Sequence, residues 1–134
     1  MYFVDDHFLL QPKRIEAICS GIVEAGVTIQ WGCEGRVDSV AQHLFPAMAK
    51  AHCRTLMFGL ESGSQKILDR LKKEQTLKEA ETAVVTAKRA GIEIVHGFFV
   101  VGNPDETVED MKATFEFAAK LPLDTFGFNR LCVY

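Results

Sequence analysis

The strongest constraint in this sequence is the regular alternation of short apolar runs with segments of helical period. Five runs have the length and composition of β-strands, and helical segments separate them along the chain. The strands are expected at 1–4, 28–32, 55–60, 93–101 and 125–133. Because each helix carries the chain back to the same end of the sheet, consecutive strands of this kind pair in parallel. The sequence therefore predicts an α/β domain with a parallel sheet.

Capping residues support the helical assignments. Thr76 with Glu79 forms a capping box at the start of one helix, and Thr107 with Asp110 marks the start of the last helix. The helix before the third strand contains Pro46, and an interior proline costs a helix about 3 kcal/mol. Only the later part of that segment is therefore expected to be regular.

Two architectures fit this order of elements, a partial (β/α) barrel of the TIM-barrel type and an open doubly wound sheet. Five strands are too few to close an eight-stranded barrel. Both ends of the chain are strand sequence, with no further helix to cover them. We expect residues 1–134 to form a single domain, a truncated piece of a larger barrel with its helices on the outer face.

Charge and hydropathy exclude several classes of protein. A net charge of −3 provides no field that attracts phosphate, so nucleic-acid binding is not expected. No run approaches the about 18 apolar residues that a membrane span needs, and the chain does not start like a signal peptide. A cytoplasmic protein without membrane contact is expected.

The four cysteines do not form a local metal or redox motif. Cys19, Cys33, Cys53 and Cys132 are too far apart in sequence for a C-x-x-C pair. Cys19 and Cys53 are expected to be small buried hydrophobes. Cys33 and Cys132 lie near predicted strand ends, so only these two raise a functional question.

Polar residues and glycines follow every predicted strand. In parallel α/β folds, helix N-termini with free N–H groups point to the carboxyl ends of the strands, where ligands bind. The segments at these positions are 5–7, 33–36, 61–64, 102–106 and Arg130. The simpler alternative is that they are only helix caps and solvated loops.

Glu61 is the strongest single candidate for a site residue. It follows an apolar strand and precedes Ser-Gly-Ser, which opens a helix whose N–H groups suit an anion. A ligand with hydroxyls and a carboxylate would fit there. Asp5 and Asp6 are adjacent, so one can point into the site while the other points away. His96 lies in the middle of a strand and is expected to be a core histidine.

Four of these segments together resemble the radical S-adenosylmethionine enzymes, and among them the group often joined to a cobalamin-binding domain. The segments are YFVDDHF at 2–8, WGCEGRVD at 31–38, GLESGS at 59–64 with Lys72-Lys73, and GFFVVGNPDET at 97–107. The resemblance implies a partial (β/α)6 barrel, of which this chain supplies roughly the second to the sixth strand. It also implies reductive cleavage of S-adenosylmethionine by a four-iron cluster to a 5′-deoxyadenosyl radical.

The resemblance assigns cofactor contacts to several residues. Asp5 and Asp6 stand where the family contacts the methionine amino group, and Arg36 would be a partner for its carboxylate. Glu61 with Ser62 stands where the family meets the ribose or the methionine moiety.

The segment from Phe98 to Glu106 resembles the family's fifth-strand motif, whose backbone lies against adenine. This assignment covers Val100, Gly102 and Asn103. Phe98 stands in place of the motif's first glycine. Asp105 replaces the glycine of the usual P-G-E-T turn.

One expected motif is absent from the 134 residues. The family binds its cluster on a C-x-x-x-C-x-x-C loop, and no such loop occurs here. Three thiolates on one loop are needed to hold three irons, and scattered cysteines do not replace them. S-adenosylmethionine, the 4Fe-4S cluster and, in this group, cobalamin are thus expected as cofactors of a longer parent enzyme. The chain alone is expected to be inactive.

Two other functions remain open at this point. One is a divalent-metal lyase or aldolase on a partial barrel, with Asp5, Asp6 and Glu61 as ligands. The other is a non-catalytic binding or assembly module. Because the outer strands expose unpaired backbone, self-association through the sheet edges is also expected.

Overall fold

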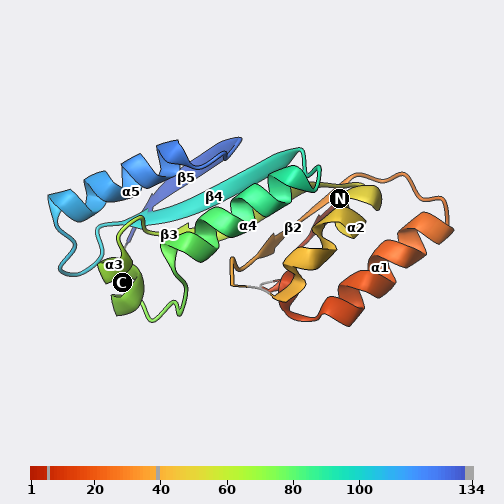
Figure 1. Ribbon diagram of the computed structural model, residues 1–134, viewed down its shortest axis with the longest axis horizontal. Coiled ribbons are helices and arrows are strands. Elements are labelled where there is room, and N and C mark those ends of the chain that lie inside the picture. Colours follow the sequence, from red (N-terminus) through yellow and green to blue (C-terminus); the bar gives the residue numbers. More distant parts are fainter. Residues whose placement is uncertain (6, 39, 132–134) are drawn as a thin grey trace.

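The computed structural model describes residues 1–5, 7–38 and 40–131 and contains one five-stranded sheet (Figure 1). The strand order is β1-β2-β3-β4-β5, and every neighbouring pair is parallel. The strands are β1 (Tyr2–Phe3), β2 (Trp31–Gly35), β3 (Cys53–Glu61), β4 (Ile94–Val101) and β5 (Thr125–Arg130). The predicted partial parallel barrel is confirmed.

Helices connect the strands and pack along one face of the sheet (Figure 1). They are α1 (Pro12–Glu24), α2 (Phe45–Lys50), α3 (Gln65–Arg70), α4 (Leu77–Arg89) and α5 (Val108–Lys120), with 3-10 turns η1 (Phe8–Leu10) and η2 (Val40–Leu44). In β3, Leu56, Phe58 and Leu60 are fully buried beneath these helices. The intervening Met57 and Gly59 are only half-buried, so the opposite face of the sheet is left open.

Both predicted capping boxes are present. Thr76 accepts a hydrogen bond from the Glu79 amide at 3.1 Å, and the Glu79 carboxylate accepts one from the Thr76 amide at 2.7 Å. Thr107 and Asp110 make the same reciprocal pair at the start of α5. These bonds satisfy amides that the first turn of a helix leaves without partners. The start of α2 at Phe45 agrees with the effect expected of Pro46.

The second strand differs most from its predicted position. It begins at Trp31 rather than at residue 28, and it continues to Gly35. Val27 and Ile29 alternate as in a strand, but both side chains are more than 40% exposed and lie before the first ladder bond. Burial against neighbouring strands, rather than local alternation, therefore sets this boundary. The first strand is also shorter than predicted, since it covers only two residues.

The cysteines near β2 and β3 belong to the core. Cys19, Cys33 and Cys53 are free and buried. A hydrogen bond with Cys53, together with burial, raises the pKa of Cys33 far above its usual range, so its thiol stays protonated. Cys33 is therefore a core residue rather than a candidate site residue, because it lies within the strand and faces the helices. Cys132 lies outside the described residues.

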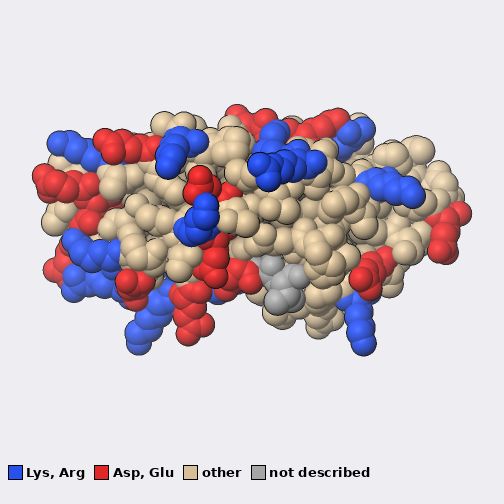
Figure 2. Space-filling view, viewed as in Figure 1, with Lys and Arg blue, Asp and Glu red and all other residues tan. Residues whose placement is uncertain are grey.

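The charged surface has no large patch of one sign on the face that carries the helices. Figure 2 shows acidic and basic side chains interspersed across this face. No helix within the described residues is long and apolar enough to cross a bilayer.

Candidate functional site

A pocket of about 230 Å³ lies at the carboxyl ends of β2, β3 and β4. Its walls come from these three strands and from the segment that leads into α4. The lining residues are Glu34, Gly35, Arg36, Gly59, Glu61, Lys73, Gln75 and Phe98. Parallel α/β folds bind ligands at this end of the sheet, as the sequence predicted.

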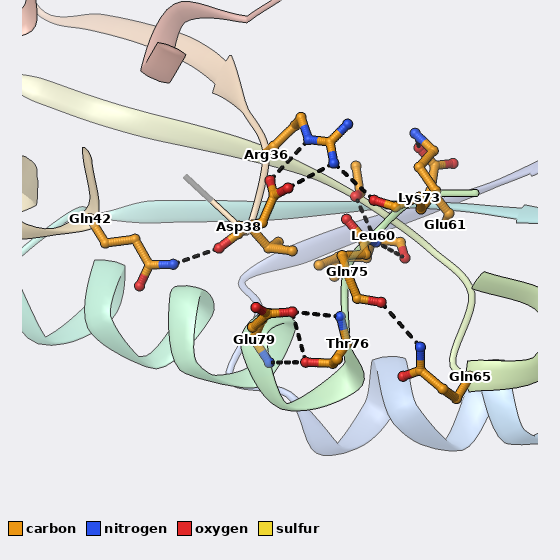
Figure 3. Close-up of polar contacts among 12 residues, drawn as sticks. Arg36, Asp38, Gln42, Leu60, Glu61, Gln65, Lys73, Gln75, Thr76 and Glu79 are labelled. Atoms are coloured by element: carbon orange, nitrogen blue, oxygen red, sulfur yellow. Dashed lines mark hydrogen bonds and ion pairs between the residues drawn. The ribbon is translucent and has the colours of Figure 1, made fainter. Parts of the chain in front are cut away.

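Glu61 occupies a specialised backbone position in this pocket. It is the last residue of β3, its φ is +65°, and the ladder with β4 is irregular between Gly59 and Glu61. A bulge of this kind changes the direction in which a side chain points. The left-handed backbone conformation of a glutamate costs on the order of 1 kcal/mol of free energy. The Glu61 carboxylate accepts a hydrogen bond from Lys73 Nζ at 2.6 Å (Figure 3). The bulge therefore directs an acidic group toward a basic one.

Gln75 holds the bulged backbone in place. Gln75 is only 3% exposed, and its side-chain amide nitrogen donates to the Leu60 carbonyl at 3.1 Å (Figure 3). That carbonyl precedes Glu61 in the chain. The contact satisfies a backbone acceptor at the irregular point of the ladder, where a strand neighbour would normally do so.

Arg36 forms the other basic side of the pocket. Its guanidinium donates twice to the Asp38 carboxylate, at 2.9 and 2.7 Å, and once to the Lys73 carbonyl at 2.8 Å (Figure 3). The hydrogen bonds with Asp38 raise the pKa of Arg36 and lower the pKa of Asp38. Arg36 thus fixes the backbone of Lys73, so the two cations are placed together.

Asp5 lies beside this pocket rather than in it. A smaller pocket of about 90 Å³ is lined by Asp5 and by Glu34, and Glu34 also lines the larger pocket. Asp5 makes an ion pair with Arg14 at 2.6 Å, and this hydrogen bond lowers the pKa of Asp5. The Tyr2 hydroxyl donates to Glu34 at 3.2 Å. Asp6, the other half of the predicted acidic pair, lies outside the described residues.

Ser62 is directed away from the pocket. It is fully buried, and its hydroxyl lies 3.0 Å from the Thr114 hydroxyl on α5. The amide of Gly63 donates to the same Thr114 oxygen at 3.0 Å, and the amide of Ser64 donates to Ser62 Oγ at 3.1 Å. The amides of Gly63 and Ser64 are therefore already bonded within the protein. Any contact that Ser62 makes with a ligand would therefore come from its backbone.

The turn after β4 contains the remaining predicted site residues. The Glu106 carboxylate accepts from the amides of Gly102, at 2.6 Å, and Asn103, at 2.9 Å. The Asn103 side-chain nitrogen donates to the Val100 carbonyl at 3.2 Å. Within the described residues, Asn103 Oδ1 is buried and makes no hydrogen bond. An unsatisfied buried acceptor of this kind is suited to a ligand that carries an amino group.

Asp105 adopts the backbone conformation that glycine favours, with φ of +60°. The resembled family has glycine at this turn position, so the conformation of the turn is retained although the residue differs. The Asp105 carboxylate pairs with Arg70 at 2.6 Å on the surface.

Three residues of this region were not identified as important from the sequence. Lys73 belongs to a basic run that is typical of a solvated helix end, and Thr114 falls within an ordinary helical stripe. Gln75 is a polar residue in a loop, and only its position directly before a capping box distinguishes it. The presence of Lys72-Lys73 beside the resembled Glu-Ser-Gly-Ser segment was the one available signal.

A partial parallel barrel with a pocket of mixed charge at its carboxyl edge places the chain among the parallel (β/α) barrel proteins. The profile of the Radical SAM superfamily matches residues 1–118. The chain therefore belongs to the radical SAM superfamily.

Two curated relatives agree with this membership. The chain is 39% identical over 127 residues to an uncharacterised methyltransferase of Pyrococcus horikoshii, covering 95% of this chain and 28% of that protein. It is 27% identical over 116 residues to the anaerobic magnesium-protoporphyrin IX monomethyl ester cyclase of Rubrivivax gelatinosus, covering 85% and 21% respectively. The chain thus spans between a fifth and a third of the length of these relatives.

The fold also matches a solved structure of the superfamily. The radical S-adenosylmethionine methyltransferase TsrM from Kitasatospora setae, with cobalamin and a [4Fe-4S] cluster bound, superposes with a TM-score of 0.83. The match covers 96% of this chain and 25% of that one at 17% identity. It supports the barrel architecture.

The described residues do not fit an iron–sulfur cluster. Across 1–5, 7–38 and 40–131, no three His, Cys, Asp or Glu residues are grouped to hold a metal ion. The three described cysteines are buried in the core. Asp5 and Glu61, proposed above as ligands of a metal-dependent lyase, are instead paired with Arg14 and Lys73. The lyase alternative is not favoured.

Proposed function

We propose that this chain is the S-adenosylmethionine-binding part of a radical SAM enzyme, with the cluster ligands supplied elsewhere in a longer parent protein. The observation that carries the proposal is the presence of two cations and two carboxylates in one pocket at the carboxyl edge of the sheet. The cations are Lys73 and Arg36, and the carboxylates are Glu34 and Glu61. The methionine moiety of the cofactor is a zwitterion, and this arrangement complements both of its charges.

Each end of the methionine moiety has partners of opposite charge. Lys73 and Arg36 hold the carboxylate, and Glu34 with Asp5 accepts hydrogen bonds from the amino group. Glu61 accepts from the ribose hydroxyls once Lys73 turns to the ligand. Asp6 adds a further acceptor for the amino group.

The adenine end lies toward the turn after β4. The backbone of Val100, Gly102 and Ser62 borders this end, and Asn103 Oδ1 accepts a hydrogen bond from the adenine amino group. Bound S-adenosylmethionine supplies the sulfonium carbon–sulfur bond that enzymes of this family cleave. The residues of this chain hold and orient the cofactor.

The parent enzyme is proposed to use a 4Fe-4S cluster and to transfer a group or oxidise its substrate. Support comes from the two relatives described above, a methyltransferase and a cyclase. Cobalamin is proposed as a further cofactor, because it is bound in the similar structure from Kitasatospora setae. The isolated chain is expected to bind cofactor without turnover.

The binding proposal is tested with Lys73→Met in isothermal titration calorimetry. We expect the wild-type chain to bind S-adenosylhomocysteine, and Lys73→Met to bind it at least about tenfold more weakly, because a charge-assisted hydrogen bond contributes roughly 1.5–3 kcal/mol. Lys78→Met is the matched control, since the Lys78 side chain is 82% exposed and lies away from the pocket. Absence of binding by the wild-type chain, or equal affinities for both variants, would contradict the proposal. Tight binding of Mg²⁺ or Zn²⁺ in place of the nucleoside would favour the lyase instead.

Self-association and a cytoplasmic location are also proposed. The edge strand β5 carries Phe126, which is 49% exposed, and α5 carries Phe115, which is 48% exposed. Both rings contact Phe128. Exposed apolar edges of this kind favour pairing between copies. The free buried thiols are typical of a reducing compartment. A sedimentation measurement that shows a monomer at high concentration would contradict self-association, and localisation of a tagged parent protein outside the cytoplasm would contradict the second proposal.

A further inference from the structure

Phe98 has an unusual setting on the open face of the sheet. It lies on β4, and its neighbours in register are Gly59 on β3 and Gly127 on β5. Neither neighbour has a side chain to cover it, so the ring stands between two strips of bare backbone. The open face at this point presents a flat aromatic surface rather than a packed layer.

The ring is supported on the side toward the middle of the sheet. The His96 ring lies 4.4 Å from the Phe98 ring, centroid to centroid, at an interplanar angle of 63°. His96 is itself fixed by a 2.7 Å contact between its Nδ1 and the Thr125 hydroxyl. His96 is therefore half-buried on the open face, and the prediction that it is a core histidine was wrong. Its position restrains Phe98 from the direction opposite to the pocket.

On its other side Phe98 borders the pocket directly. It lines the same cavity as Glu61, Lys73 and Arg36. The cavity volume of about 230 Å³ is below the about 300 Å³ at which pockets for drug-sized ligands begin. A nucleoside held here would therefore fill the pocket with only part of its volume and extend over the neighbouring open face. Phe98 stands at that boundary.

We propose that Phe98 is a stacking platform for the adenine base of bound S-adenosylmethionine. The inference rests on the proposed function and adds a side-chain contact to it. In the resembled motif the corresponding residue is a glycine, which lets adenine approach the backbone. A phenyl ring blocks that approach and offers a π surface in its place, and Gly59 and Gly127 leave room for the base beside it.

The test compares ligands that share or lack the adenine base. The ligands are 5′-methylthioadenosine, S-adenosylhomocysteine and methionine, each titrated into wild-type chain and variants. Phe98→Ala is expected to weaken binding of both adenine-containing ligands by about five- to 150-fold, the range found when aromatic platforms for bases are removed. Phe98→Tyr is expected to stay within about threefold of wild type, and methionine binding is expected to be unchanged.

Two further variants separate stacking from folding. Phe98→Leu keeps an apolar side chain without a ring, and it is expected to weaken adenine binding while its circular dichroism spectrum stays native. Phe126→Ala is the matched control, because Phe126 lies on the next strand in register with Gly97, on the opposite face. It is expected to bind as wild type does. Upfield shifts of the adenine H2 and H8 resonances with wild-type chain, absent with Phe98→Leu, would give direct evidence of stacking.

The outcomes that refute this inference differ from those that refute the proposed function. If the wild-type chain binds neither nucleoside, the proposed function fails and the stacking role fails with it. If the wild-type chain binds both nucleosides and the Phe98 variants bind equally well, only the stacking role fails. Displacement of an adenine-free planar probe such as indole by 5′-methylthioadenosine supports adenine as the occupant. Simultaneous binding of the two overturns it.

Discussion

Replacing Thr114 with valine should destabilise the fold and loosen the loop that follows Glu61. The Thr114 hydroxyl accepts from Gly63 and lies within bonding distance of Ser62, and it donates to the Asp110 carbonyl at 3.0 Å. Valine has nearly the same shape and no hydroxyl. The variant therefore leaves the Gly63 amide and the Ser62 hydroxyl without their partner.

The size of the effect follows from burial. Thr114 and Ser62 are both at 0% exposure, so water does not replace the lost bonds. Each buried donor left without a partner costs about 1–3 kcal/mol, and Ser62 still accepts from Ser64, which reduces its share. The expected loss is about 2–4 kcal/mol in the free energy of unfolding. With a mid-range urea slope of about 2 kcal/mol per molar, the midpoint should fall by roughly 1–2 M.

Urea unfolding followed by circular dichroism measures this loss, with Thr114→Ser as the matched control. Serine keeps the hydroxyl and removes one methyl group, which costs about 1 kcal/mol. The difference between the two variants therefore isolates the hydroxyl. If Thr114→Val unfolds within about 0.5 kcal/mol of Thr114→Ser, the hydroxyl is not the anchor of this loop and the reasoning is refuted.

Two further predictions concern Asp105 and Asp110. Asp105→Gly should raise the free energy of unfolding by about 0.5–1 kcal/mol, because it relieves a left-handed φ and loses only an exposed ion pair with Arg70. Thermal unfolding measures this change, and a lower melting temperature would contradict the prediction. The hydrogen bond from Lys66, with those from Thr107 and Ser64, lowers the pKa of Asp110 well below its usual range. The contribution of Asp110 to the free energy of unfolding is therefore present above about pH 4 and is lost as the pH falls below that value. Asp110→Asn should accordingly flatten the acid limb of the stability curve between pH 5 and 2, and an unchanged slope would contradict the assignment.

The fold was predictable because its signals are local or periodic. The capping boxes at Thr76 and Thr107 place two helices by contacts within four residues, and the apolar run of β4 marks a strand. The run indicated burial on both faces, but alternate residues of β4 are only half-buried, so that part of the prediction was wrong. The start of β2 was not predictable in the same way. Val27 and Ile29 alternate as a strand does, and only the pairing of Trp31 with Cys53 shows where the ladder begins. That pairing joins residues far apart in the sequence.

The site was predictable in its position and less so in its residues. The polar ends of the strands identified the carboxyl edge of the sheet, and Glu61 and Arg36 do line the pocket there. Lys73 and Thr114 were missed because each acts across a long sequence separation, toward Glu61 and toward Ser62. Ser62 is of a residue type common at ligand sites, but its side chain bonds Thr114 on α5. Residue type alone does not distinguish these two uses.

Both cations of the pocket are already paired before any ligand arrives. Lys73 with Glu61 and Arg36 with Asp38 form two neutral couples, so little positive potential extends beyond the pocket mouth. A ligand is consequently not drawn in from a distance, and its rate of capture should vary little with ionic strength. Occupancy in a cell would then follow the abundance of the nucleoside itself, and a modest change in that pool would alter how much of the protein is loaded.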